Sequence, residues 1–173
     1  MRINWKGAFQ CAGVQSAFTK SRWMRARATP NMTRIDFYTH VTDRAGVVCQ
    51  LTAKAVAQGK RVMIFTSSPA ETDAIDQRLW TFNQLSFIPH CRANHALANE
   101  TPVIIDHLSD NIPHHEILIN LHADWPRFFS RFERLMEIVS QEHEIATAAR
   151  QRFRYYRDCG YDIQSHNLSH LGN

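Results

Sequence analysis

Short apolar runs alternate with amphipathic stretches along the chain from residue 34 onward. Residues 34–40 place Ile35 and Phe37 on the same side of an extended segment, which predicts a strand. The continuous apolar run at 60–66 is typical of a buried parallel strand. Two further strands are expected at 102–106 and 116–121.

Helical periodicity predicts elements between and after these strands. Apolar positions recur at helical spacing over 42–58. The same spacing continues over 125–139, where Trp125 and Pro126 form the expected start of a helix. A last helix is expected from about residue 142 to Cys159, immediately before a glycine.

The helix expected after residue 67 has the clearest start. Ser68 can cap it, Pro69 fits the first helical position, and Glu71 can complete a capping box. Residues 83–101 are expected to be mostly irregular. Strands that alternate with helices in this way predict an α/β fold, a single three-layer sandwich with a mostly parallel sheet.

Such a fold is Rossmann-like, but the sequence carries no nucleotide-binding motif. The Gly59-Lys60 pair lacks the upstream glycine and the Ser/Thr of a P-loop, and there is no GxGxxG. The four cysteines and ten histidines form no CxxC or HExxH spacing, and no serine lies in a GxSxG elbow. We therefore expect no cofactor, no metal site and no catalytic residue.

Charge divides the chain into two parts. Residues 1–35 hold seven of the 20 basic residues and none of the 16 acidic ones, so 36–173 carry a net charge of −3. Residues 1–31 are expected to be a basic, poorly ordered extension, either a transit-like leader or a segment upstream of a natural start at Met32. The domain then covers 32–173. No run is long enough to span a bilayer, and separated cysteines fit a cytoplasmic protein.

Residues 150–157 pack four arginines and three aromatic residues into eight positions. Arg150, Arg154 and Arg157 lie four and then three positions apart, which places them on one face of a helix, with Phe153 at the edge of that face. This face suits an acidic partner that carries a hydrophobic group. The alternative is a helix with solvated arginines and aromatic residues in the core.

Trp80 and Phe87 form the second candidate site. Trp80 lies at the end of the second expected helix and Phe87 lies in the segment after it. As a buried pair they would only fill the core. As an exposed pair they would be suitable anchors for a protein partner, because tryptophan is enriched at binding hot spots.

Residues 34–164 resemble the chi subunit of bacterial DNA polymerase III, an accessory protein of the clamp-loader complex. The likeness rests on the order and separation of several stretches, which are Gly59–Ile64, Ile75–Trp80, Ser86–His90, Glu116–Leu121, Ala149–Arg157 and Gly160-Tyr161.

The resemblance implies an adaptor without intrinsic enzymatic activity. Members of the family pair with a small subunit, psi, and bind the acidic C-terminal tail of single-stranded-DNA-binding protein, so that DNA is contacted only indirectly. Trp80 and Phe87 match the aromatic positions of the psi interface. The positions that receive the tail correspond to Val139, Arg150, Phe153 and Arg154, and Arg157 extends the same basic face.

This chain departs from the family pattern at three of these positions. Phe153 replaces a tyrosine, Arg154 replaces a lysine, and Ala146 stands where the family has a further lysine. Two other functions stay open on the sequence alone. One is a divergent nucleotide-binding α/β enzyme of helicase or hydrolase type. The other is a direct nucleic-acid binder that uses 150–157.

Overall fold

The computed structural model describes residues 32–83, 87–108 and 112–169, so the expected extension at 1–31 lies outside the described residues. Within these ranges one sheet has the strand order β3-β4-β2-β5-β6-β1-β7, and every neighbouring pair is parallel. The strands are β1 (Arg34–Val41), β2 (Val62–Phe65), β3 (His90–Cys91), β4 (Val103–Asp106), β5 (Ile117–Asn120), β6 (Arg134–Ser140) and β7 (Ile163–Asn167).

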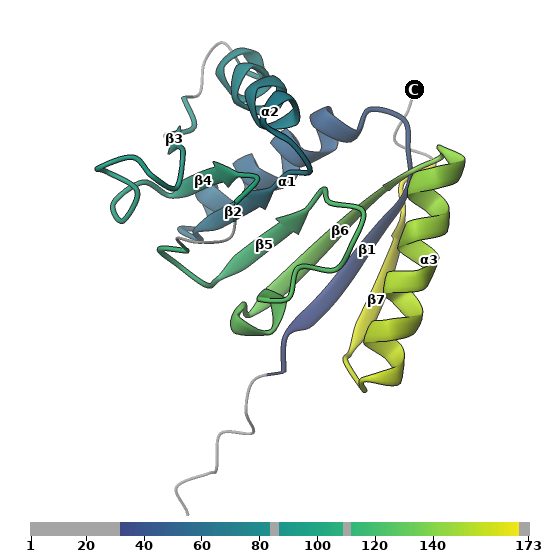
Figure 1. Ribbon diagram of the computed structural model, residues 1–173. Helices are drawn as coiled ribbons and strands as arrows, with labels where there is room; N and C mark the ends of the chain where they lie inside the picture. The colour runs from purple at the N-terminus through teal and green to yellow at the C-terminus, as the bar shows by residue number, and fades with distance from the viewer. Residues whose placement is uncertain (1–31, 84–86, 109–111, 170–173) are drawn as a thin grey trace, which may run out of the picture.

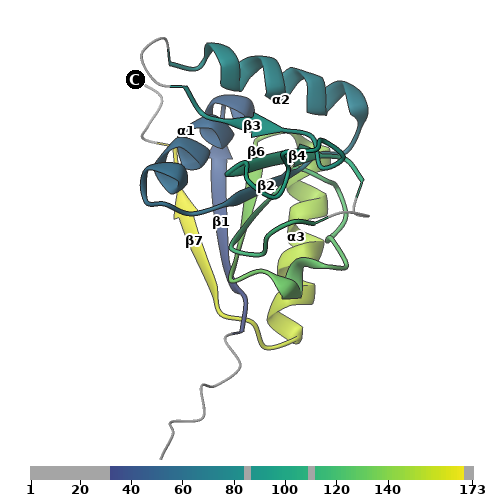
Figure 2. The ribbon, with the colours of Figure 1, turned by 90° about the vertical axis from the view of Figure 1, so that its left-hand side faces the viewer.

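Helices cover both faces of the sheet, which confirms the predicted three-layer α/β sandwich (Figures 1 and 2). Helices α1 (Arg44–Ala57) and α2 (Pro69–Thr81) pack on one face, and α3 (His143–Asp158) packs on the other. None of the helices in the described part of the chain is long and apolar enough to cross a membrane.

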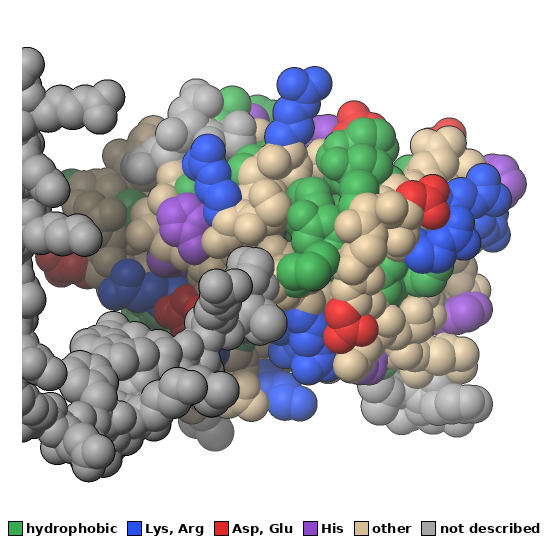
Figure 3. Space-filling model, turned by 90° about the horizontal axis from the view of Figure 1, so that it is seen from below, with side chains coloured by type: hydrophobic (Ala, Val, Ile, Leu, Met, Phe, Trp, Pro, Cys, Tyr) green, Lys and Arg blue, Asp and Glu red, His purple; other side chains and the backbone are tan. Residues whose placement is uncertain are grey.

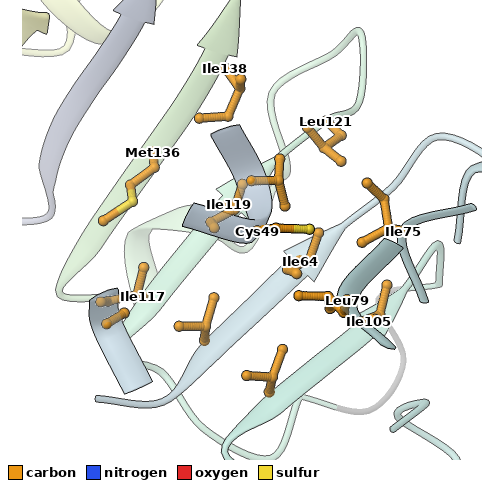
Figure 4. Packing of buried hydrophobic residues seen from close by; sticks show 14 of the residues in the cluster. Cys49, Ile64, Ile75, Leu79, Ile105, Ile117, Ile119, Leu121, Met136 and Ile138 are labelled. Carbon is orange, nitrogen blue, oxygen red and sulfur yellow. The ribbon is translucent and has the colours of Figure 1, made fainter. Parts of the chain in front are cut away.

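The central strands are buried on both sides, which explains their uninterrupted apolar sequences. Ile64 and Ile119 face α1 and α2, whereas Met63 and Leu118 face α3, and all four are fully buried. Figure 4 shows the first of these layers, with Cys49 of α1 among the isoleucines. Burial raises the pKa of the Cys49 thiol to about 11, so this cysteine is a packing residue rather than a nucleophile.

The expected helix start at Ser68 is confirmed, with one difference. The Ser68 hydroxyl accepts a hydrogen bond from the Glu71 amide at 3.2 Å. The Glu71 carboxylate, however, accepts from the amide and hydroxyl of Ser67, both at 2.7 Å, one residue before the position that a capping box uses.

The prediction of a helix over 125–139 is wrong. A single 3-10 turn, η1 (Phe129–Arg131), follows the Trp125-Pro126 pair, and strand β6 begins at Arg134. Leu135 and Val139 face α3, whereas Met136 faces α1 and α2. A strand buried on both faces is apolar at most positions, so it also satisfies a helical spacing by coincidence. Strands β3 and β7 were not predicted.

Candidate functional site: a cationic pocket beside helix α3

A pocket of about 570 Å³ opens between α3 and the carboxyl-terminal ends of β1 and β6. Its apolar lining comes from three elements that are far apart in the sequence. Phe37 belongs to β1, Val139 to β6, and Ala149 and Phe153 to α3. The rings of Phe37 and Phe153 meet edge to face with their centroids 5.3 Å apart. This contact holds Phe153 against the sheet, and arginines of α3 line the same pocket.

Arginines supply the charge of the pocket. Arg150, Arg154 and Arg157 all line it, and its described lining contains no Asp or Glu. Arg157 forms an ion pair with its neighbour Asp158 at 2.9 Å. Neither Arg150 nor Arg154 has an ion-pair partner among the residues that the structure describes. Two guanidinium groups beside an apolar slot provide a site for a carboxylate next to a hydrophobic group.

The pocket differs in charge from the end of the molecule seen from below in Figure 3. There basic, acidic and histidine side chains are intermixed around an apolar patch. Mixed charges of this kind largely cancel at a distance, whereas a lining with one sign of charge attracts the opposite sign.

The fourth arginine of the 150–157 segment belongs to the core. Arg152 is 2% exposed and donates to Glu137 on β6 from Nε at 3.0 Å and from Nη2 at 2.8 Å. It also donates to the carbonyl of Ala123. Glu137 accepts further hydrogen bonds from the Tyr156 hydroxyl at 2.9 Å and from the Asn120 amide at 3.1 Å. Burial, and then the Glu137 charge, raise the pKa of Tyr156, so it stays a hydrogen-bond donor.

The structure therefore brings together all five residues expected to receive an acidic tail: Val139, Arg150, Phe153, Arg154 and Arg157. The sequence did not reveal the contribution of β1 and β7, from which Thr39, His40 and Ser165 also line the pocket. Their participation depends on which strands pair in space. No spacing in the sequence indicated it.

The second candidate site lies on a different part of the molecule. Trp80 is 58% exposed and Phe87 is 63% exposed, and their ring centroids are 5.0 Å apart. His90 also packs against Trp80, and the centroids of their rings are 5.1 Å apart. Exposed aromatic rings that contact one another form a small apolar patch (the Trp80–Phe87 patch), of the kind that binds protein partners.

The described ranges give less support to a metal site or to a phosphate-binding site. No cluster of three or more His, Cys, Asp or Glu side chains there is arranged to hold a metal ion. The start of α2 follows β2, where a Rossmann-like fold often binds a phosphate. Here the chain's own Glu71 carboxylate accepts the hydrogen bonds of Ser67 at that helix start, and Arg44 approaches it at 3.4 Å.

Comparisons with known proteins agree with the resemblance seen in the sequence. The family model described as "DNA polymerase III chi subunit, HolC" matches residues 32–164. The DNA polymerase III subunit chi of Pseudomonas aeruginosa is 38% identical over 81% of this chain and 100% of its own length.

More distant relatives carry the same name. The subunit chi of Haemophilus influenzae is 31% identical over 70% of this chain and 85% of its own length. That of Escherichia coli is 28% identical over 69% of this chain and 82% of its own length. The chain thus belongs to the family of DNA polymerase III chi subunits, accessory proteins of DNA replication.

Proposed function

We propose that this protein is a non-catalytic adaptor of the replicative DNA polymerase holoenzyme. It would join the psi subunit of the clamp loader to the acidic C-terminal tail of single-stranded-DNA-binding protein, and contact DNA only indirectly in the cytoplasm. The observation that carries the proposal is the α3 pocket, in which Arg150 and Arg154 border an apolar slot and no acidic side chain competes for them.

A tail that ends in an apolar residue suits this pocket chemically. Its last side chain would occupy the slot formed by Val139 and Phe153, and its carboxylates would accept hydrogen bonds from Arg150 and Arg154. We expect micromolar binding, on the order of −8 kcal/mol.

Titration calorimetry with a synthetic tail peptide tests this assignment. Arg150→Ala and Arg154→Ala should each weaken binding about tenfold, because a hydrogen bond to a charged group contributes about 1.5–3 kcal/mol. Arg131→Ala is the matched control, since Arg131 is exposed and does not line the pocket. If both pocket variants bind as tightly as the unaltered protein, the tail does not occupy this site.

The Trp80–Phe87 patch is the proposed site for psi. Its two rings are exposed and carry no charge, so they would become buried against an apolar partner surface. The double variant Trp80→Ala, Phe87→Ala should lose psi in a co-purification and keep the tail peptide. Retention of psi would reject this assignment.

A nucleotide-binding enzyme is the less favoured function. The start of α2 is occupied by the Glu71 carboxylate, which would repel a phosphate at that position. Equilibrium dialysis with labelled ATP distinguishes the two functions, because stoichiometric binding would favour the enzyme. A direct nucleic-acid binder would shift a bare oligonucleotide without any carrier protein.

A further inference from the structure

Strand β1 contains an irregularity immediately beside the pocket. It pairs with β6 in register from Arg34 to Tyr38, after which three steps along β1 match only two steps along β6. The extra residue is accommodated by His40, which has a φ of 61° and is the one residue other than glycine with positive φ in the described ranges. Such a conformation is unfavourable for a side chain with a Cβ, and bulges of this kind often redirect side chains near functional sites.

The bulge turns His40 toward the pocket. Neighbouring residues of a regular strand point to opposite faces, yet Thr39 and His40 both line the pocket. Tyr38 and Val41, three positions apart, correspondingly both pack in the core under α1 and α2. Without the extra residue, His40 would point toward the face of the sheet that α1 and α2 cover.

The imidazole is placed to contact a ligand. His40 is exposed, and its Nδ1 lies 3.2 Å from the Thr39 hydroxyl, an interaction that orients the ring. The other nitrogen, Nε2, has no hydrogen-bond partner in the part of the chain that the structure describes.

The groups around His40 favour an anion in the pocket. Helix α3 contributes Arg150, Arg154 and Arg157, and no carboxylate belongs to the described lining. The end of β6 contributes Val139, Ser140 and Gln141, and β7 contributes Ser165, none of which is charged. Asp158 is paired with Arg157.

We propose that His40 is a further binding residue of this pocket, whose protonated imidazole pairs with a carboxylate of the acidic tail. The inference rests on the proposed function and adds pH dependence to it. A carboxylate bound beside the imidazole of His40 favours the protonated form of the ring. Binding therefore takes up a proton, so the affinity rises as the pH falls through the range in which histidine titrates.

The test is calorimetry at about pH 8 and about pH 6, on either side of the ordinary histidine pKa of about 6.5. The probe is a short synthetic peptide of aspartates that ends in phenylalanine with a free carboxylate. Its own carboxyl groups titrate near pH 4, below this range. The unaltered protein should bind about threefold more tightly at the lower pH, the gain typical of one exposed ion pair.

The variant His40→Asn should show the same affinity at both pH values. Asparagine tolerates the left-handed conformation, so the bulge is retained, and a thermal melt checks that the fold is intact. His143→Asn is the matched control. His143 is an exposed histidine at the start of α3 that does not line the pocket, so this variant should keep the full pH response.

His166 requires a separate check, because it is a second histidine near Thr39. Its Nε2 is 2.8 Å from Asp36 and its ring stacks on Tyr38, away from the pocket. A pH response that persists in His40→Asn would assign it to another group and overturn the inference, while the proposed function would stand. A flat response in the unaltered protein would also overturn the inference. No binding at either pH would reject both.

Discussion

The two sides of helix α3 use the same residue type for opposite purposes. On the side that faces the sheet, Arg152 is buried and donates to Glu137 and to the main chain. On the side that borders the pocket, Arg150 and Arg154 have no ion-pair partner among the residues described. All of these arginines lie within five positions of one another, so only their helical spacing, and not the composition of the segment, distinguishes them.

The difference shows that the strand beneath the helix decides what each arginine does. Glu137 on β6 lies under Arg152 and binds it, whereas Val139, two residues further along the same strand, lies under the pocket arginines. A carboxylate at the first position fixes the helix on the sheet. An apolar residue at the second leaves the cations available for a carboxylate from another molecule.

Arg152→Ala is expected to have the largest effect. It leaves Glu137 buried without its cation, and the loss of one partner of a buried ion pair costs about 3–5 kcal/mol. Urea unfolding should show this decrease in the free energy of unfolding. Arg157→Ala is the control from the exposed side and should cost less than about 0.5 kcal/mol, even though it removes the ion pair with Asp158. Equal effects of the two variants would mean that the faces do not differ in this way.

The neighbouring tyrosines allow a finer comparison. Tyr156→Phe keeps the buried ring but removes the hydroxyl that donates to Glu137 at 2.9 Å, for an expected cost of about 1–2 kcal/mol. Tyr155→Phe removes a hydroxyl from an exposed ring that stacks on Trp125, and the stability should stay within about 0.5 kcal/mol. Thermal unfolding of both variants measures the difference, and a larger loss in Tyr155→Phe would contradict it.

Most of the fold could be predicted because its elements have local determinants. The Ser68 cap, the buried run of β2 and the last helix all depend on residues close in sequence. The prediction of a helix over 125–139 failed because the polar residues of β6, Arg134, Glu137 and Ser140, lie three positions apart, which is closer to helical spacing than to the alternation of a strand.

The site was predictable to the same extent and for the same reason. The spacing of Arg150, Arg154 and Arg157 on one helix determined that they share a face. The partner of Arg152 could not be predicted, because Glu137 lies on a separate strand. The position of His40 depends on a bulge in the pairing of β1 with β6, which is a property of the assembled sheet.

The smallest expected effect is a difference in salt dependence between the two sides of α3. Exposed charges are screened over a Debye length of about 10 Å at 0.1 M ionic strength and about 3 Å at 1 M, whereas a buried pair is screened much less. Raising the ionic strength from about 0.1 M to about 1 M should weaken the binding of the tail peptide about threefold, as measured by calorimetry. The coupling energy between Arg152 and Glu137, measured by a double-mutant cycle of unfolding, should change by less than about 0.5 kcal/mol. A coupling that falls with salt as the peptide affinity does would show that water reaches the Arg152–Glu137 pair, and the two faces would then differ in degree rather than in kind.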